Sequence, residues 1–262
     1  MASDRIRLDQ ALVQRGLIHS REQAKRLILA GEVRVNGALA SKPGGWVRGD
    51  DVLEVKERPR FVGRGGLKLE GALEHFGIDV TGKICLDVGA STGGFTDCLL
   101  QRGASRVHAF DVGTNQLVWK LRSDPRVVSR ENFNVRHMQP EDVGEPVHLI
   151  VADVSFISLT KVLPAALSCL VPGGEAVVLV KPQFELSRDE VGRGGIVRES
   201  GLHRKACEKI QRFVQDDQRC EWRGLVESSV QGTDGNREFL AWFGRVGRSP
   251  EGEQSPGGVP DL

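Results

Sequence analysis

A glycine-rich turn follows a short apolar run in the stretch LDVGASTGGFTD. Gly89, Gly93 and Gly94 lie within six positions, and Asp87 stands two residues before the first of them. Glycines let a backbone approach a ligand closely and adopt positive φ without a Cβ clash. Ser91 stands where a dinucleotide site has its second glycine, and no Gly-Lys-Ser/Thr follows as in a phosphate-binding loop. Because Asp87 would repel a phosphate, the turn favours a cofactor with a cationic centre and no phosphate.

A second acid strengthens this interpretation. S-adenosylmethionine carries a sulfonium and an ammonium group, and Asp87 could face that positive charge. Asp111 ends the next strand-like run, HAFDVG, 24 residues after Asp87. A carboxylate at this strand end binds the ribose hydroxyls in dinucleotide folds. The turn and the acid together predict an S-adenosylmethionine site, and the alternative is a turn with a purely structural role.

Two more side chains close strand-like runs and could do chemistry. Asp153 ends HLIVAD, and Lys181 ends AVVLVK. A lysine at the end of a buried strand is unusual, because burial disfavours its charge. Methyl transfer requires that the acceptor be aligned with the sulfonium carbon and that one proton be removed. A lysine beside an acid fits an alcohol acceptor, whose proton must leave. The alternative is a structural ion pair between Lys181 and Asp153.

Alternating strands and helices from about residue 67 must position these groups. The expected strands are 84–88, 106–112, 126–130, 147–153, 175–181, 222–230 and 237–244, and the expected helices are 66–76, 93–102, 114–121, 158–169 and 200–216. Strands that are apolar throughout belong in a sheet covered on both faces. The pattern predicts an α/β, Rossmann-like doubly wound domain, in which ligands bind beyond the carboxyl ends of the strands. The last two strands are expected to form an antiparallel hairpin.

A small basic module precedes this domain. Leu8 and Leu12 lie at helical spacing, and Ser20 opens a second helix that ends near Gly31. EVRVNG, with an Asn-Gly turn, and DDVLEV alternate as strands do. Residues 1–62 carry 12 Lys and Arg against 8 Asp and Glu, whereas the remainder carries 24 against 27. This asymmetry indicates an anionic partner for the module, unless it is only scatter in surface charge.

Composition also sets the boundaries and the class of protein. We expect an α+β domain over 1–58, a linker over 59–66, a catalytic domain over 67–246 and a disordered tail over 247–262. The five cysteines are dispersed and form no metal-binding pattern, which predicts reduced thiols and no metal site. The N-terminus lacks a signal-like apolar region, and no apolar run approaches the roughly 18 residues of a membrane span. These features predict a soluble, cytoplasmic protein.

Several motifs together resemble a known family. RGGLKLEGAL, LDVGASTGGFTD, FDVG, ADVSFISL, LVKPQFE and GNREFLAWF occur in the order found in the TlyA (hemolysin A) family. Its members are FtsJ-like 2′-O-methyltransferases of ribosomal RNA with an N-terminal S4 domain. The similarity runs from about residue 5 to residue 244 and implies S-adenosylmethionine as cofactor and ribosomal RNA, within ribosomal subunits, as partner. A preference for cytidine ribose rests on the resemblance alone. The sequence does not indicate an oligomeric state.

The resemblance also implies roles for individual residues. It implies a catalytic set of Lys68, Asp153, Lys181 and Glu238, in which Lys181 is the general base or its close equivalent and Asp153 orients it. The implied cofactor contacts are Asp87, Gly89, Ser91, Gly93, Phe95, Asp111, Val112, Asn134 and Asp153. Phe133 stands where the family usually has threonine, and PRFV departs from the linker of some members. From their charge alone, Lys68 and Glu238 would be unremarkable.

An RNA substrate would explain the basic module, because S4 domains bind structured RNA largely through its shape and backbone. The expected phosphate contacts are Arg5, Arg7, Arg21, Lys25, Arg26 and Arg34. Arg193 and Arg198 lie in a glycine-rich segment that could cover the acceptor strand. Phe156 and Phe184 are the aromatic residues that could stack on a base, although core positions are more usual for both.

Three rival functions remain. A base N-methyltransferase would have Asp/Asn-Pro-Pro-aromatic where this chain has Asp153-Val154-Ser155-Phe156. A non-catalytic RNA-binding or ribosome assembly factor could retain a cofactor pocket, although the intact lysine and acid set counts against it. A membrane-damaging protein would need an apolar segment, which the sequence does not supply.

Overall fold

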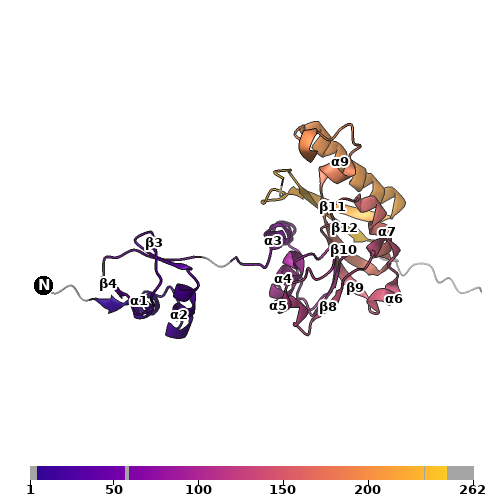
Figure 1. Ribbon diagram of the computed structural model, residues 1–262. Coiled ribbons are helices and arrows are strands. Elements are labelled where there is room, and N and C mark those ends of the chain that lie inside the picture. Colours follow the sequence, from indigo (N-terminus) through magenta and orange to yellow (C-terminus); the bar gives the residue numbers. More distant parts are fainter. Residues whose placement is uncertain (1–4, 57–58, 233, 247–262) are drawn as a thin grey trace, which may run out of the picture. The chain divides into compact units, whose positions relative to one another are not determined.

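Two compact units make up the chain, Met1–Pro59 and Arg60–Leu262. Their structure is given by a computed structural model that describes residues 5–56, 59–232 and 234–246 (Figure 1). The tail predicted over 247–262 lies outside the described residues.

The first unit is a small α+β domain around one apolar core. Its elements are β1 (Ile6–Arg7), α1 (Leu8–Gln14), α2 (Arg21–Leu29), β2 (Val33–Val35), β3 (Ala38–Leu39), β4 (Trp46–Val47) and β5 (Leu53–Val55). The Ser20 side chain caps α2 by accepting from the Gln23 N–H, as the sequence predicts. Asn36 and Gly37 both have positive φ, which suits the tight turn between β2 and β3. Leu8, Leu12 and Ile28 are among its core residues.

One sheet of this unit is not evident from sequence. β3, β2 and β5 form the three-stranded sheet that the strand patterns indicate, whereas β1 and β4 form a separate antiparallel pair. Each strand of that pair has two residues, which is too short for alternation to be recognised.

The second unit is a seven-stranded mixed sheet with the order β11-β12-β10-β9-β6-β7-β8. The strands are β6 (Ile84–Val88), β7 (Arg106–Phe110), β8 (Val127–Arg130), β9 (Val147–Ala152), β10 (Leu170–Val180), β11 (Cys220–Glu227) and β12 (Phe239–Arg245). β6 to β10 pair in parallel. β12 runs antiparallel to both β10 and β11, so the predicted hairpin is confirmed.

Helices cover both faces of this sheet (Figure 1). The longer ones are α3 (Gly65–Phe76), α4 (Gly94–Gln101), α7 (Leu163–Ser168) and α9 (Ser200–Arg212), and the short ones are α5 (Trp119–Arg122), α6 (Pro140–Val143) and α8 (Pro182–Glu185). One core joins α3, α4 and α5 to the sheet, and the other joins α6, α7 and α9 to the opposite face. This three-layer arrangement confirms the α/β, Rossmann-like prediction.

The predicted helix over 114–121 is largely wrong. Only Trp119–Arg122 is helical, because the Glu131 carboxylate accepts hydrogen bonds from the N–H groups of residues 115–117 at 2.7, 2.9 and 3.1 Å. These bonds hold the segment as a turn in which Asn115 has φ 53°.

The predicted helix over 158–169 is divided. A 3₁₀ turn at Leu159–Lys161 precedes α7, which has a proline in its first turn. The predicted helix over 200–216 is also divided. Its α-helical part, α9, ends at Arg212 and is followed by a π-helical turn over Phe213–Asp217.

The segment expected to be a linker over 59–66 packs against the second unit from Arg60 onward. Phe61 is only 4% exposed, and a Cβ added to Gly66 would lie 2.3 Å from its ring. Gly65 and Gly66 already belong to α3. The polar and glycine-rich residues around Phe61 suggest a flexible linker, but burying the apolar Phe61 side chain stabilises the packed segment.

Candidate active site

The candidate catalytic residues meet at one edge of the sheet. Asp153 follows β9, and Lys181 follows β10, so both lie at the carboxyl ends of adjacent parallel strands. Glu238 precedes β12, whose first residue, Phe239, pairs with Val180 of β10. The antiparallel direction of β12 therefore brings its amino end to the edge where the parallel strands finish.

Lys181 is held by an acid and a hydroxyl. Its Nζ lies 2.6 Å from Asp153 Oδ1 and donates to Ser155 Oγ at 2.8 Å. The lysine side chain is 10% exposed, whereas that of Asp153 is 23% exposed. Nζ is therefore fixed in place but remains at the cavity wall, where it could reach a hydroxyl group.

A second ion pair lies beside the first. Lys68 Nζ is 2.5 Å from Glu238 Oε2, and both side chains are almost buried. Lys68 comes from the first turns of α3, whose Leu69 and Leu73 pack in the core. Two lysines and two carboxylates therefore form pairs of opposite charge, which offsets the cost of burying each ion.

All four residues line a cavity of about 260 Å³. The remaining lining residues are Gly63, Arg64, Gly65, Gly89, Ala90, Ser91, Thr92, Gly94, Phe95 and Ser155. The catalytic set from the family resemblance is thus brought together next to the glycine turn.

The turn requires glycine at two positions for different reasons. Gly89 has φ 84°, and a Cβ there would lie 2.5 Å from the carbonyl oxygen of Asp153. Gly93 has φ 101°, and a Cβ there would lie 2.2 Å from Leu121 Cδ1. Gly89 lets the turn pass close to the end of β9, whereas Gly93 lets it pack on α5. Gly93 itself lines neither cavity described here.

A larger cavity of about 600 Å³ continues from the first. The two share Gly89, Ser91, Asp153 and Ser155. Asp111, Val112 and Asn134, which the family resemblance implies as cofactor contacts, line the larger cavity. Its other lining residues are Phe110, Gln116, Val135, Arg136, Val154, Phe156, Ile157 and Val162. An elongated ligand could therefore place one end at Asp111 and the other at Lys181.

Asp111 is fixed by backbone donors. Its carboxylate accepts from the N–H of Ser91 at 2.8 Å and from that of Gly113 at 2.6 Å. Ser91 has φ 49°, an unusual value for a serine, so its N–H points at Asp111 at some cost in backbone strain. Each carboxylate oxygen keeps capacity to accept from a ribose hydroxyl.

Asp87 does not face the cavities, contrary to the sequence-based expectation. It is fully buried and lines neither of them. One of its oxygens accepts from the Thr96 hydroxyl at 2.6 Å, while Oδ1 has no hydrogen-bond partner among the described residues. Burial is the main cause that raises the pKa of Asp87 to about 7; the charges of Asp153 and Asp111 also raise it, and the hydrogen bond from Thr96 lowers it. Its influence on a bound cation would act across the turn, through the electric field.

The residues fit S-adenosylmethionine on two counts. Gly89 lines both cavities and places no side chain in them, and the Asp111 carboxylate lines the larger cavity, where it can accept from ribose hydroxyls. Asp111, Asn134 and Val112 would hold the adenosine end, and Asp153 and Phe95 the methionine end. The described residues contain no group of three or more His, Cys, Asp or Glu placed to bind a metal ion.

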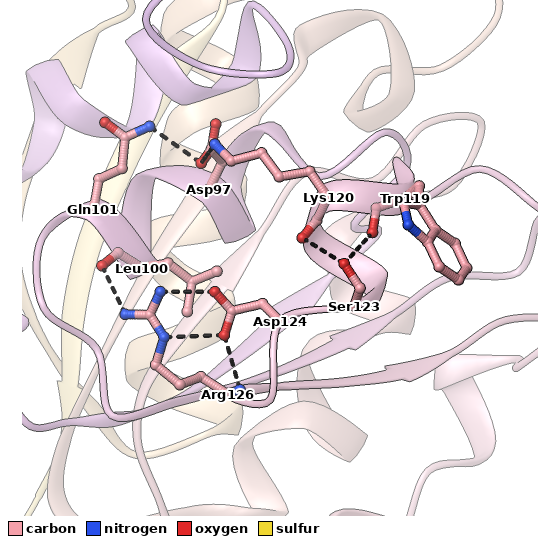
Figure 2. A network of polar contacts seen from close by, with 8 residues as sticks. All are labelled: Asp97, Leu100, Gln101, Trp119, Lys120, Ser123, Asp124 and Arg126. Carbon is pink, nitrogen blue, oxygen red and sulfur yellow. Dashed lines mark hydrogen bonds and ion pairs between the residues drawn. The ribbon is translucent and has the colours of Figure 1, made fainter.

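The segment after Pro59 supports the glycine turn. Asp97 of α4 accepts from the Val62 N–H at 2.9 Å, from Gln101 at 3.1 Å and from Lys120 of α5 at 3.4 Å. Figure 2 shows Gln101 and Lys120 converging on Asp97 from two helices. A Cβ added to Gly63 would lie 3.0 Å from Thr92 Oγ1, so this segment rests directly on the turn.

We expect Phe61→Leu to weaken cofactor binding. The smaller side chain would leave space beneath Gly66, cost about 1–2 kcal/mol of stability and loosen the segment that rests on Thr92. Isothermal titration calorimetry should show a raised Kd for S-adenosylmethionine, and thermal unfolding a lowered Tm. Leu67→Ala, on an exposed side chain in the first turn of α3 next to this segment, is the control. An unchanged Kd in Phe61→Leu would show that the packing of this segment does not affect cofactor binding.

The expected phosphate contacts of the first unit differ in their surroundings. Arg7 and Arg21 both bind the buried carboxylate of Asp9. Arg34 donates to the Gly37 carbonyl at 2.8 Å. The remaining candidates, Arg5, Lys25 and Arg26, have exposed or half-buried side chains.

One of the two candidate stacking residues, Phe156, lines the larger cavity. Phe156 is 91% exposed and has φ 64°, so the interpretation of Phe156 as a core residue is wrong. Its ring centroid is 5.2 Å from that of the half-buried Phe184. The Arg198 side chain is exposed, whereas that of Arg193 lies outside the described residues.

Two further sequence-based points concern cysteines and membrane spans. All five cysteines are buried, free thiols. Among the described residues, no helix combines the length and the apolar character needed to cross a membrane.

Comparison with known proteins assigns both units. The model of the FtsJ-like methyltransferases matches residues 61–245, and that of the S4 domain matches residues 6–53. The chain is 48% identical to the 16S/23S rRNA (cytidine-2′-O)-methyltransferase TlyA of Mycobacterium tuberculosis over 91% of this chain and 90% of the relative. It is 44% identical to hemolysin A of Brachyspira hyodysenteriae over 91% and 99% of the two chains.

A solved structure is similar throughout. A candidate hemolysin from Streptococcus thermophilus is 48% identical, with a TM-score of 0.71 over 94% of this chain and 90% of the other. The chain therefore belongs to the TlyA (hemolysin A) family, whose members join an S4 domain to an FtsJ-like, S-adenosylmethionine-dependent methyltransferase domain.

Proposed function

We propose that this methyltransferase modifies the ribose 2′-hydroxyl of a cytidine in ribosomal RNA, within ribosomal subunits, and that Lys181 is the general base. The observation that carries the proposal is the position of Lys181 Nζ, 2.6 Å from Asp153 and in the same cavity as the glycine turn. The relative from M. tuberculosis is a 16S/23S rRNA (cytidine-2′-O)-methyltransferase, which supports the choice of substrate. The reaction would take place in the cytoplasm, where ribosomal subunits are assembled.

The chain's own residues account for the steps of transfer. S-adenosylmethionine, when bound, supplies a methyl group on a positively charged sulfur. Lys68 and Glu238 border the space beside Lys181 and would orient the 2′-hydroxyl toward that methyl carbon. As the 2′-oxygen takes up the methyl group, the hydroxyl proton would pass to the amine of Lys181. Asp153 and Ser155 would then stabilise the ammonium group that results.

A labelled-cofactor experiment tests the reaction. The protein is incubated with methyl-labelled S-adenosylmethionine and undermethylated ribosomal subunits, and the modified nucleosides are mapped. We expect label in 2′-O-methylcytidine. Label on a base would instead identify a base N-methyltransferase, and an absence of transfer would favour an assembly factor that retains a cofactor pocket.

Phe156 would contact the acceptor nucleoside. Bases of unpaired nucleotides commonly stack on aromatic side chains, and this ring is exposed at the wall of the larger cavity. We expect Phe156→Ala to raise KM for ribosomal subunits about tenfold, in line with roughly 1–3 kcal/mol per stacked base. Steady-state kinetics with saturating cofactor would measure this, and Phe156→Tyr should stay near wild type. Equal KM values for the alanine and wild-type proteins would place the base elsewhere.

A further inference from the structure

An exposed tryptophan marks the surface of the first unit. Trp46 of β4 is 65% exposed, although a large apolar side chain on a small domain gains stability by burial. Its neighbour Val47 pairs with Ile6 and is 3% exposed, so that pair faces the core. Trp46 pairs with Arg7 on the opposite, solvent-facing side of the same two strands. Directly opposite residues of antiparallel strands are neighbours, so the indole and the Arg7 side chain share one surface.

A buried carboxylate fixes the cations beside this tryptophan. Asp9 is 0% exposed and accepts from Arg7 through both oxygens, each at 3.1 Å, and from Arg21 at 3.3 Å. The hydrogen bond from Arg7 is the main cause that holds the pKa of Asp9 below its usual range, so the carboxylate stays charged. The two guanidinium groups therefore keep their places without a ligand.

These cations still face solvent. The side chains of Arg7 and Arg21 are 39% and 50% exposed. Two guanidinium groups around one carboxylate leave a net positive charge, and Lys25 follows Arg21 by one turn of α2. A Cβ added to Gly44 would lie 3.1 Å from Arg7 Nη1, so this guanidinium lies against the loop that leads into β4. The surface thus offers an aromatic ring and pre-positioned cations side by side.

We propose that Trp46, Arg7 and Arg21 form a binding site for one unpaired nucleotide of RNA, in which the indole stacks on the base and the guanidinium groups bind its phosphate. A base offers a flat apolar face and the phosphate a negative charge, which together match this surface. The proposal rests on the proposed function only in taking RNA as the partner. It adds that the first unit recognises a single-stranded position as well as a charged backbone.

The site predicts different effects on single-stranded and paired RNA. We compare full-length variants for binding to an unstructured oligocytidine and to an RNA duplex with the same number of phosphates. Trp46→Ala should weaken oligocytidine binding about tenfold and leave duplex binding unchanged, because bases in a duplex are already stacked. Trp46→Phe should retain the affinity, whereas Trp46→Leu, which is apolar but has no ring face, should behave like the alanine variant.

Controls separate stacking from general damage. Leu39→Ala removes a side chain of the same unit that is 62% exposed, and it should bind both RNAs like wild type. Arg7→Gln should weaken both RNAs and lower the dependence of log Kd on log salt, since a phosphate contact is lost. Equal losses on the two RNAs in Trp46→Ala, no loss in that variant, or retained affinity in Trp46→Leu would overturn the proposal.

Methyl transfer by the wild-type protein is measured in parallel. If it transfers no methyl group to ribosomal subunits while the Trp46 variants show the expected binding pattern, the proposed function fails and the nucleotide site stands. If transfer occurs and the binding pattern is absent, the nucleotide site fails alone.

Discussion

Replacing Lys181 by alanine should lower the rate of methyl transfer by about 10²–10⁴-fold, the usual contribution of a general base. Lys181 Nζ is the amine held against Asp153 and Ser155 at the wall of the smaller cavity, of about 260 Å³. The variant removes the proposed proton acceptor but leaves the glycine turn and Asp111 in place. We therefore expect kcat for subunit methylation to fall while Kd for S-adenosylmethionine, from calorimetry, stays near wild type.

Lys181→Arg distinguishes a base from a structural ion pair. Arginine can keep the pairing with Asp153, but its guanidinium cannot be deprotonated in a protein and so cannot accept the proton. A base at position 181 requires that Lys181→Arg be as inactive as the alanine variant. Substantial activity in the arginine variant would instead mean that only the positive charge matters there.

A matched lysine provides the control for this comparison. Lys161, in the 3₁₀ turn before α7, is exposed and lines neither of the two site cavities. Lys161→Ala should transfer methyl groups at the wild-type rate.

Local patterns in the sequence identified the parts of the site that lie at strand ends. Asp111, Asp153 and Lys181 each close an apolar run, and the parallel sheet places such ends at one edge. The glycine turn could also be predicted, because its residues are consecutive in the sequence. These predictions depend only on residues that are close together in the sequence, and the structure keeps those residues close together in space.

Lys68 and Glu238 show what local patterns could not reveal. The two residues are 170 positions apart in the chain, and only the antiparallel strand β12 brings Glu238 to Lys68. Neither residue ends a parallel strand, so their charge and spacing did not indicate a place in the site. Only the family resemblance pointed to them.

Long-range contacts also account for two of the errors. Glu131 holds the turn after β7 from 14 to 16 residues away and prevents the helix that local propensity favours. Asp87 was expected to face the cofactor. It is instead fully buried below the turn, because α4 packs over it and places the Thr96 hydroxyl against its carboxylate.

Asp87 should make the stability of the protein fall as pH rises from about 4 to about 7. Burial raises its pKa to about 7 in the folded chain, against roughly 3.9 for an unfolded aspartate. Between these values the native state binds more protons than the unfolded state, so stability decreases with increasing pH and levels off above about 7. A difference of roughly 3 pH units corresponds to about 4 kcal/mol.

Asp87→Asn isolates this contribution. Asparagine is neutral at every pH and can still accept from the Thr96 hydroxyl. The free energy of unfolding, from urea titrations at pH 4.5 to 8 without cofactor, should fall by roughly 3 kcal/mol more in wild type than in the variant. Parallel pH dependences for the two proteins would show that Asp87 does not titrate in this range.

The same carboxylate should link cofactor binding to a proton. Burial, with a smaller contribution from the negative charges of Asp153 and Asp111, favours protonated Asp87, and S-adenosylmethionine would bring positive charge to the other side of the turn. The cation offsets those negative charges and favours ionised Asp87, so binding should release a proton below pH 7, and Kd should rise by up to about tenfold for each unit of pH decrease. Calorimetry in buffers of different ionisation enthalpy counts that proton. Because the cofactor's own amine titrates identically with either protein, a proton release shared by wild type and Asp87→Asn would assign it to the ligand, whereas a release confined to wild type places it on the buried acid beneath the turn.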